Sequence, residues 1–265
     1  MLKEIISLQN PKIKHLLQIK EKSRRRKKDC IFIIEGRKEL NLAIKNGYRI
    51  KTIYCVLELC GSILDSYMDG NIEIISVSNK IYKKIAYRGS TEGLIAIAES
   101  KSHLLNDIKI KNKNPFLLVA QSIEKPGNIG ALIRTADAAN IDALIIADPK
   151  TDIYNPNVIR SSVGGIFTIQ IAIANSNDVI DFMNNRNIPI YSAILQKSIS
   201  YDKANYVSSC CIAVGSENKG LSNIWKKSAS KKIKIPMLGN LDSINVSVAA
   251  GIILFEVCRQ RKINT

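Results

Sequence analysis

The sequence predicts a two-domain α/β protein whose C-terminal domain is built on a parallel β-sheet. Runs typical of strands alternate with helical patterns along the whole chain. In the second half these runs, such as FLLVA at 116–120, are continuously apolar, as in parallel sheets covered on both faces. A polar, charged segment at 101–115 separates the two halves, so we expect domains over residues 1–104 and 105–265.

The N-terminal domain is expected to be a small α/β sandwich that follows a basic stretch at 12–28. In the helical segment 37–47, Leu40, Ala43 and Ile44 share one face and Gly47 ends the pattern. A second helix is predicted at 78–87. The predicted strands are 30–36, 50–56, 71–78 and 93–99.

The C-terminal domain repeats this alternation. Its predicted strands are 115–121, 142–148, 167–173, 188–195, 210–215 and 231–237. Its predicted helices are 128–140, 177–187, 219–228 and 245–261, and 155–165 is interpreted as a loop leading into a helix. Ligands of parallel sheets bind beyond the carboxyl ends of the strands. Three loops with unusual chemistry are expected there: 124–130, 215–220 and 237–245.

The charge of the chain favours a polyanionic partner. The formal net charge is +16, which makes nucleic acid the first candidate and an anionic membrane surface the second. AT-rich coding could also add lysines without function, but it accounts poorly for the adjacent arginines at 24–26.

Other classes are disfavoured by the composition. The apolar runs are too short to span a membrane, and the N-terminus is too charged for a signal peptide, so we expect a cytoplasmic protein. The six cysteines form no CxxC pair and there are only two histidines. We therefore expect no metal site and reduced, mostly buried thiols.

The first two loops each admit a structural and a functional interpretation. Neither GxGxxG nor GxxxxGK[ST] is present, which excludes those two phosphate-binding signatures. Asn128 could cap the helix that follows it, and Arg134 lies near the positive end of that helix, a poor place for a structural cation. Arg134 could instead be solvated or paired with Asp137, and Glu217 could be an ordinary first-turn carboxylate.

The third loop is harder to explain structurally. Five small polar residues crowd it between apolar segments: Asn240, Asp242, Ser243, Asn245 and Ser247. Ser243 or Asn245 is a natural N-cap for the helix that follows. The buried face of that helix is marked by Val246, Ala249, Ala250 and Ile253. Capping cannot account for all five side chains, so the loop is predicted to belong to a binding site.

Three segments together resemble a known family. NIGALIRTADAANI, AVGSENKGLS and IPMLGNLDSINVSVAAGI are similar, in order and spacing, to motifs one, two and three of the SpoU family of RNA 2′-O-ribose methyltransferases, within the trefoil-knotted SPOUT superfamily. FIIEGRKELNLAIKNG and TEGLIAIAE resemble parts of the substrate-binding domain that many members carry. The resemblance covers essentially the whole chain.

The resemblance implies a cofactor and a set of site residues. S-adenosylmethionine would be held mainly by backbone groups at Gly215, Ile235, Met237, Leu238 and Ile244. Arg134 would act on the ribose hydroxyl, within a polar ring of Asn128, Glu217, Ser243 and Asn245. Because a guanidinium pKa lies above about 12, Arg134 would either orient and electrostatically activate the hydroxyl or act as a base only after perturbation by phosphate.

The resemblance also implies partners. Members are typically homodimers, and the additional N-terminal domain favours 23S ribosomal RNA as the substrate; the alternatives are transfer RNA or a non-catalytic RNA-binding role. The chain departs from the family pattern at Gln121, Lys125 and Ile244, none of which is assigned to chemistry. The residues expected to bind RNA are Arg24, Arg25, Arg26, Lys27, Lys28 and Arg160.

Overall fold

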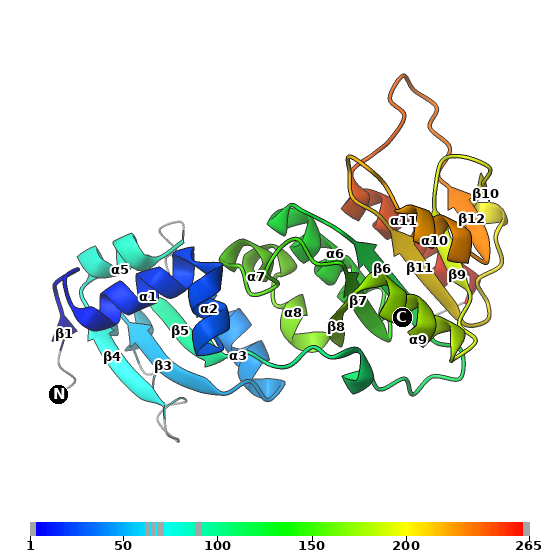
Figure 1. Cartoon of the computed structure of the whole chain (residues 1–265). Coiled ribbons are helices and arrows are strands. Elements are labelled where there is room, and N and C mark those ends of the chain that lie inside the picture. The colour runs from blue at the N-terminus through cyan, green and yellow to red at the C-terminus, as the bar shows by residue number, and fades with distance from the viewer. Residues whose placement is uncertain (1–3, 62–63, 65–66, 68–71, 88–91, 262–265) are drawn as a thin grey trace. The chain divides into compact units, whose positions relative to one another are not determined.

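The computed structural model (Figure 1) describes residues 4–61, 64, 67, 72–87 and 92–261. The chain forms two units: unit 1 comprises Met1–Ser102 and Asp152–Thr168, and unit 2 comprises His103–Thr151 and Ile169–Thr265. A single boundary between two domains was predicted, near residue 105. Instead the chain crosses from one unit to the other three times, after residues 102, 151 and 168.

Unit 1 is built on a mixed sheet in the order β1-β4-β3-β5-β2. Its strands are β1 (Glu4–Ile5), β2 (Ile31–Glu35), β3 (Ile50–Cys55), β4 (Glu73–Val77) and β5 (Leu94–Glu99). β5 is antiparallel to both of its neighbours, whereas β1, β4 and β3 run parallel. The strands predicted from the sequence are confirmed here to within a few residues at each end.

The helices of unit 1 include several that the sequence analysis missed. They are α1 (Pro11–Glu21), α2 (Ser23–Asp29), α3 (Arg37–Lys45), α4 (Leu57–Cys60), α5 (Asn79–Ile85), α7 (Pro156–Ser162) and α8 (Gly165–Thr168). The stretch noted only as basic is helical because Asn10 caps α1, and Ile13, Leu16 and Ile19 form its buried face.

The segment 152–168 belongs to the core of unit 1. The Phe32 ring on β2 stacks on Tyr154 with centroids 4.2 Å apart, and Tyr48 meets Phe167 edge to face at 5.1 Å. The segment 155–165 was interpreted as a loop leading into a helix, but most of it is helical: the Asn155 side chain accepts a hydrogen bond from the backbone of Asn157, and α7 begins at Pro156.

Unit 2 is built on a seven-stranded sheet in the order β10-β12-β9-β11-β6-β7-β8, and every pairing in it is parallel. The strands are β6 (Phe116–Gln121), β7 (Ala143–Ala147), β8 (Ile171–Ala174), β9 (Ile190–Ala193), β10 (Ile199–Ser200), β11 (Cys210–Val214) and β12 (Lys231–Lys234). The predicted parallel sheet is therefore confirmed. The strand expected at 167–173 starts later, because α8 occupies its first residues.

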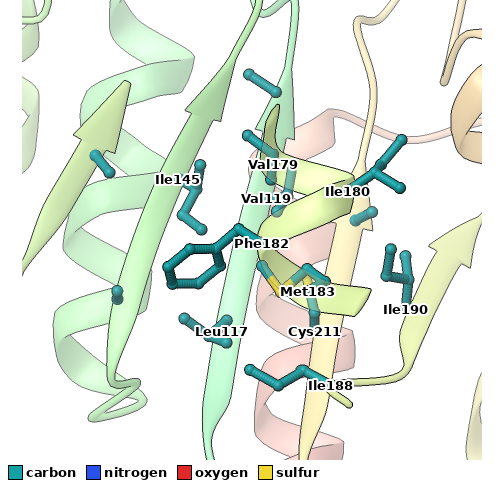
Figure 2. Close-up of a cluster of buried hydrophobic side chains, with 14 of the residues drawn as sticks. Leu117, Val119, Ile145, Val179, Ile180, Phe182, Met183, Ile188, Ile190 and Cys211 are labelled. Carbon is teal, nitrogen blue, oxygen red and sulfur yellow. The ribbon is translucent and has the colours of Figure 1, made fainter. Parts of the chain in front are cut away.

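Helices cover this sheet. They are η2 (Leu105–Asp107), α6 (Pro126–Ala138), α9 (Ser176–Asn184), η3 (Tyr201–Lys203), α10 (Asn223–Ser228) and α11 (Val246–Gln260). Figure 2 shows Val179, Phe182 and Met183 of α9 lying over the apolar side chains of the central strands. All three are at most 5% exposed, so burial of this face fixes α9 on the sheet. Within the described ranges, no helix has the length and hydropathy that a membrane span requires.

Candidate active site

A cavity of about 560 Å³ lies in unit 2 where three neighbouring parallel strands end. The residues that follow β9, β11 and β12 line it, together with the start of α11. The carboxyl ends of these strands meet at one edge of the sheet, which is where ligands of such sheets bind. The second and third unusual loops are thereby brought to one place, as predicted.

The loop after β11 is held in shape by its own backbone. Ser216 and Gly220 form an isolated antiparallel bridge, and the Gly220 N–H donates to the Ser216 carbonyl at 2.9 Å. A Cβ placed on Gly215 would lie 2.2 Å from the carbonyl carbon of Gly220, so no larger residue fits there. Gly220 itself has a φ of +61°, which favours glycine. The two glycines therefore fold the loop tightly and present Glu217 at its tip.

A row of hydrogen bonds connects the three predicted polar segments. The Asn245 Oδ1 accepts from the Ser247 N–H at 2.9 Å, which orients the Asn245 amide. Its Nδ2 then donates to Asn128 Oδ1 at 3.2 Å, and Asn128 Nδ2 donates to Glu217 Oε1. Each side-chain orientation determines the next, so the N-terminus of α11 fixes the carboxylate 28 residues before it.

Asn245 serves two functions at once. It is the N-cap of α11, as the sequence predicted, and the buried face of that helix includes Val246, Ala250 and Ile253. Asn128, in contrast, does not cap α6: the helix begins at Pro126, and Lys125 occupies the cap position without a side-chain hydrogen bond. Asn128 is thus the third residue of the helix, and its amide bridges Asn245 and Glu217.

Four of the five residues predicted to bind the cofactor line the cavity. Gly215, Ile235, Met237 and Ile244 line the cavity, as do Ser243 and Asp242. Leu238 does not line it and is 98% exposed, on the loop that projects beyond the sheet between β12 and α11 (Figure 1). A contact between Leu238 and the cofactor therefore has no support within this cavity.

Arg134 lies apart from the polar row. It is exposed on α6, it is not among the residues that line the cavity, and it makes no ion pair with any residue in the described part of the chain, Asp137 included. Six residues separate it from Asn128, which is about 120° around a helix of 3.6 residues per turn. The expectation that the polar ring holds Arg134 is thus not met within one chain.

Several residues that line the cavity were not predicted from the sequence. The segment that follows β9, residues 193–196, lines the cavity, and so do Lys219, Lys226 and Lys234. β9 reaches the site because it lies between β11 and β12 in the sheet, and strand order is not readable from the sequence. The lysines gave no pattern of their own in a chain with 39 basic residues.

The unusual residue Gln121, at the end of β6, has a structural function. It is buried, its amide donates to Asp148 Oδ2 at 3.1 Å, and its carbonyl oxygen accepts from the Ser222 N–H at 3.0 Å. Burial alone would raise the pKa of Asp148, but hydrogen bonds from Ser176 and Gln121 outweigh it and the pKa is lowered. Gln121 therefore links β7 to the end of the loop that carries Glu217.

The basic helix α2 in unit 1 does not expose all of the cations that were predicted to bind RNA. Arg26 is 4% exposed; its Nε donates to Asp152 Oδ2 at 2.7 Å and its Nη1 to the carbonyl oxygen of Ile19 at 2.7 Å. The assignment of Arg26 to RNA binding is therefore wrong, because its charge is neutralised inside unit 1. Arg25 pairs with Asp29 at 2.6 Å and remains partly exposed. Arg24, Lys27, Lys28 and Arg160 are exposed.

Known protein families match segments in both units of the chain. Residues 115–255 match the SpoU rRNA Methylase family, and residues 10–96 match the MRM3-like substrate binding domain. The 23S rRNA (guanosine(2553)-2'-O)-methyltransferase RlmP of Bacillus subtilis is 26% identical over 256 residues, which are 97% of this chain and 99% of that protein.

Solved structures agree. An RNA 2'-O ribose methyltransferase is 34% identical with a TM-score of 0.85, over 98% of this chain and 100% of that one. An AdoMet-bound rRNA methyltransferase from Sinorhizobium meliloti is 28% identical with a TM-score of 0.89, over 100% of this chain and 99% of that one.

Proposed function

The chain belongs to the SpoU rRNA methylase family, and we propose on that premise that it transfers the methyl group of S-adenosylmethionine to a ribose 2′-hydroxyl of 23S ribosomal RNA. The observation that carries this proposal is the row Asn245–Asn128–Glu217, whose two ends, Asn245 and Glu217, line the cavity. An RNA-binding protein without catalysis would need the basic surface but not this row.

The cavity suits the cofactor. Its volume of about 560 Å³ lies in the range of small-molecule sites. Apolar side chains such as Ile235, Met237 and Ile244 line it, and the tight turn at Gly215 and Gly220 forms part of its wall. This apolar wall, with the polar residues Asp242 and Ser243 beside it, fits an adenosine with a flexible tail. When bound there, S-adenosylmethionine supplies an electrophilic methyl group on a sulfonium.

The residues of the chain act on the nucleophile. A ribose hydroxyl is a very weak acid, so it must be aligned with the methyl carbon and the charge left by its proton must be stabilised. Glu217 Oε1 is held by Asn128, and its Oε2 has no hydrogen-bond partner in the described part of the chain. We assign Oε2 to accept the proton of the ribose hydroxyl as its oxygen takes the methyl group, and Ser243 and Asn245 to the positioning of the sugar.

Arg134 provides the positive charge in this proposal, and it does so from a second subunit. It does not line its own cavity, and the outer face of α11 calls for a partner: Val248 and Phe255 are each 52% exposed on a helix whose other face is already buried. Leu238 and Leu241 add further exposed apolar surface next to the site. A homodimer that covers this surface would bring the Arg134 of one chain to the cavity of the other. We place the protein in the cytoplasm, with the ribosomal RNA that it modifies.

Calorimetric titration with S-adenosylmethionine tests the cavity. The wild type should bind one molecule per chain. Ala249→Phe should lose binding, because Ala249 lines the cavity from α11. Gly239→Ala is the matched control, since a Cβ there meets nothing within 4 Å and Gly239 is outside the cavity. Gly215→Val is less informative, because it would distort the loop itself. Undiminished binding by Ala249→Phe would show that the cofactor site lies elsewhere.

A further inference from the structure

A second cavity, of about 190 Å³, lies within unit 1 and takes no part in the proposed chemistry. Its lining residues include Glu35 to Glu39, where β2 leads into α3, together with Lys20 of α1, Tyr87 just after α5, and Arg160 of α7. Its volume suits one nucleobase and is too small for a cofactor such as a dinucleotide.

Tyr87 is an exposed aromatic residue on a fixed backbone. The Lys20 ammonium donates to the carbonyl oxygens of Ile85 and Ala86, both at 2.8 Å, and Glu35 Oε2 accepts from the Tyr87 N–H at 2.8 Å. These bonds hold the backbone up to and including the Tyr87 N–H, and Tyr87 is 37% exposed. An accessible aromatic ring on an anchored backbone is the arrangement on which unpaired bases stack.

Two cations adjoin the ring. The Lys20 Nζ lies 5.8 Å from its centroid and the Arg160 Cζ lies 5.7 Å from it. Lys20 is committed to the two carbonyl oxygens, whereas Arg160 is exposed and forms no ion pair within the described ranges. Arg160 is therefore available to a phosphate attached to a base that stacks on Tyr87.

A carboxylate inside the cavity selects the base. Glu35 and Glu92 already accept from the backbone N–H groups of Tyr87 and Arg37. Glu39, in the first turn of α3, lines the cavity and accepts no side-chain or backbone hydrogen bond in the described part of the chain. A carboxylate repels phosphate and accepts two parallel N–H groups, which guanine presents through N1 and N2 and uracil does not.

We propose that this cavity, defined by Tyr87, Arg160 and Glu39, binds one unpaired guanine of the RNA substrate. The guanine stacks on Tyr87, donates to the Glu39 carboxylate and places its phosphate against Arg160. This inference rests on the proposed function for the identity of the ligand as RNA, and it assigns unit 1 a base-specific contact in addition to its charge.

The test measures fluorescence anisotropy of labelled single-stranded hexaribonucleotides, oligo-U and the same oligomer with one central G, with the full-length protein. The wild type should prefer the G-containing oligomer by about tenfold, the discrimination of a bidentate base contact. Tyr87→Leu should weaken binding of both oligomers by about tenfold, because base–aromatic stacking is lost. Tyr87→Phe should bind like the wild type.

Two further variants complete the design. Glu39→Gln should abolish the preference for G without weakening the binding of oligo-U. Tyr201→Leu, at a partly exposed tyrosine of unit 2 outside the cavity, should change nothing. Wild-type affinity in Tyr87→Leu, or a preference for G that survives in Glu39→Gln, would overturn the proposal.

Methyl transfer to ribosomal RNA, assayed on the same preparations, separates the two hypotheses. If the wild type methylates RNA while the oligomers show no Tyr87 or Glu39 effect, the guanine site is refuted and the proposed function stands. If the effects are present without any methyl transfer, the guanine site stands and the proposed function fails.

Discussion

Asn245 shows how one side chain can satisfy both the fold and the site. Its Oδ1 caps α11 through the Ser247 N–H, and its Nδ2 donates to Asn128. The two functions use different atoms of the same amide, so they can be separated by mutation.

Asn245→Asp should keep the cap but lose the donor to Asn128 and add a charge near Glu217. We expect the free energy of unfolding to stay near the wild-type value while methyl transfer falls sharply. Asn245→Ala should lose both, with a stability loss of about 1 kcal/mol for the missing cap. Urea unfolding and kcat of the three proteins measure this. Full activity in Asn245→Asp would show that the row of amides is not needed.

Arg26 shows what residue patterns do not reveal. Five of the six residues in SRRRKK at 23–28 are basic, so no apolar periodicity marks one of the arginines as buried. The carboxylate that neutralises it, Asp152, lies 126 residues later. Asn128, Glu217 and Asn245 were predictable as a group because each belongs to a motif with fixed spacing; the position of Arg134 outside their cavity was not.

In helix α2, only part of the cluster predicted to bind RNA is exposed. Arg24, Lys27 and Lys28 are exposed and free to meet phosphates, whereas Arg26 is internal and Arg25 pairs with Asp29. Each cation that neutralises a phosphate contributes about 0.7 to the logarithmic salt slope of single-strand binding. Replacing Arg24, Lys27 and Lys28 by Gln should therefore lower the slope by about 2.

RNA-binding curves at several salt concentrations measure that change. A triple variant at Lys109, Lys111 and Lys113, near the start of unit 2, is the control with the same loss of charge. If the salt slope of the α2 variant equals that of the wild type, Arg24, Lys27 and Lys28 face solvent and do not contact RNA.

The segment 152–168 is the element that sequence reasoning misplaced. It contributes Asp152, Tyr154 and Phe167 to unit 1, although in the sequence it stands between β7 and β8 of unit 2. Asp152→Asn removes the partner of a buried arginine, which costs about 3–5 kcal/mol when a buried pair is broken.

Chemical unfolding of Asp152→Asn tests this, with Asp107→Asn as an exposed control. A fragment ending at residue 104 should likewise be destabilised, because its Arg26 would be buried without a carboxylate. A stability loss below about 0.5 kcal/mol, the usual range for surface substitutions, would show that the pair is dispensable.

At the scale of the whole molecule, the parallel sheet was predictable and its strand order was not. The continuous apolar runs at β6, β7 and β11 identify strands covered on both faces. That β9 and β12 adjoin β11, and so bring residues 193–196 to the cavity, depends on contacts between distant segments. Val248 and Phe255, on the outer face of α11, are each 52% exposed, and the proposal that a second subunit covers them rests on contacts that no pattern in the sequence reveals.

Subunit complementation tests whether Arg134 serves the cavity of its partner. Arg134→Ala and Glu217→Gln should each abolish activity as homodimers while S-adenosylmethionine binding survives. Random pairing of the two variants should restore about one quarter of the wild-type rate, since half of the dimers are mixed and one of their two sites is intact. No recovery would mean that both residues act within one chain.

Isotope-resolved mass spectrometry can show whether the protein transfers a methyl group to ribose. Unmodified 23S ribosomal RNA is incubated with the protein and with S-adenosylmethionine carrying a trideuterated methyl group, then digested to nucleosides. We expect label in one 2′-O-methylnucleoside, on the sugar fragment, and its loss with Glu217→Gln. Label on a base, or none in any nucleoside, would show that the protein does not methylate ribose in this RNA.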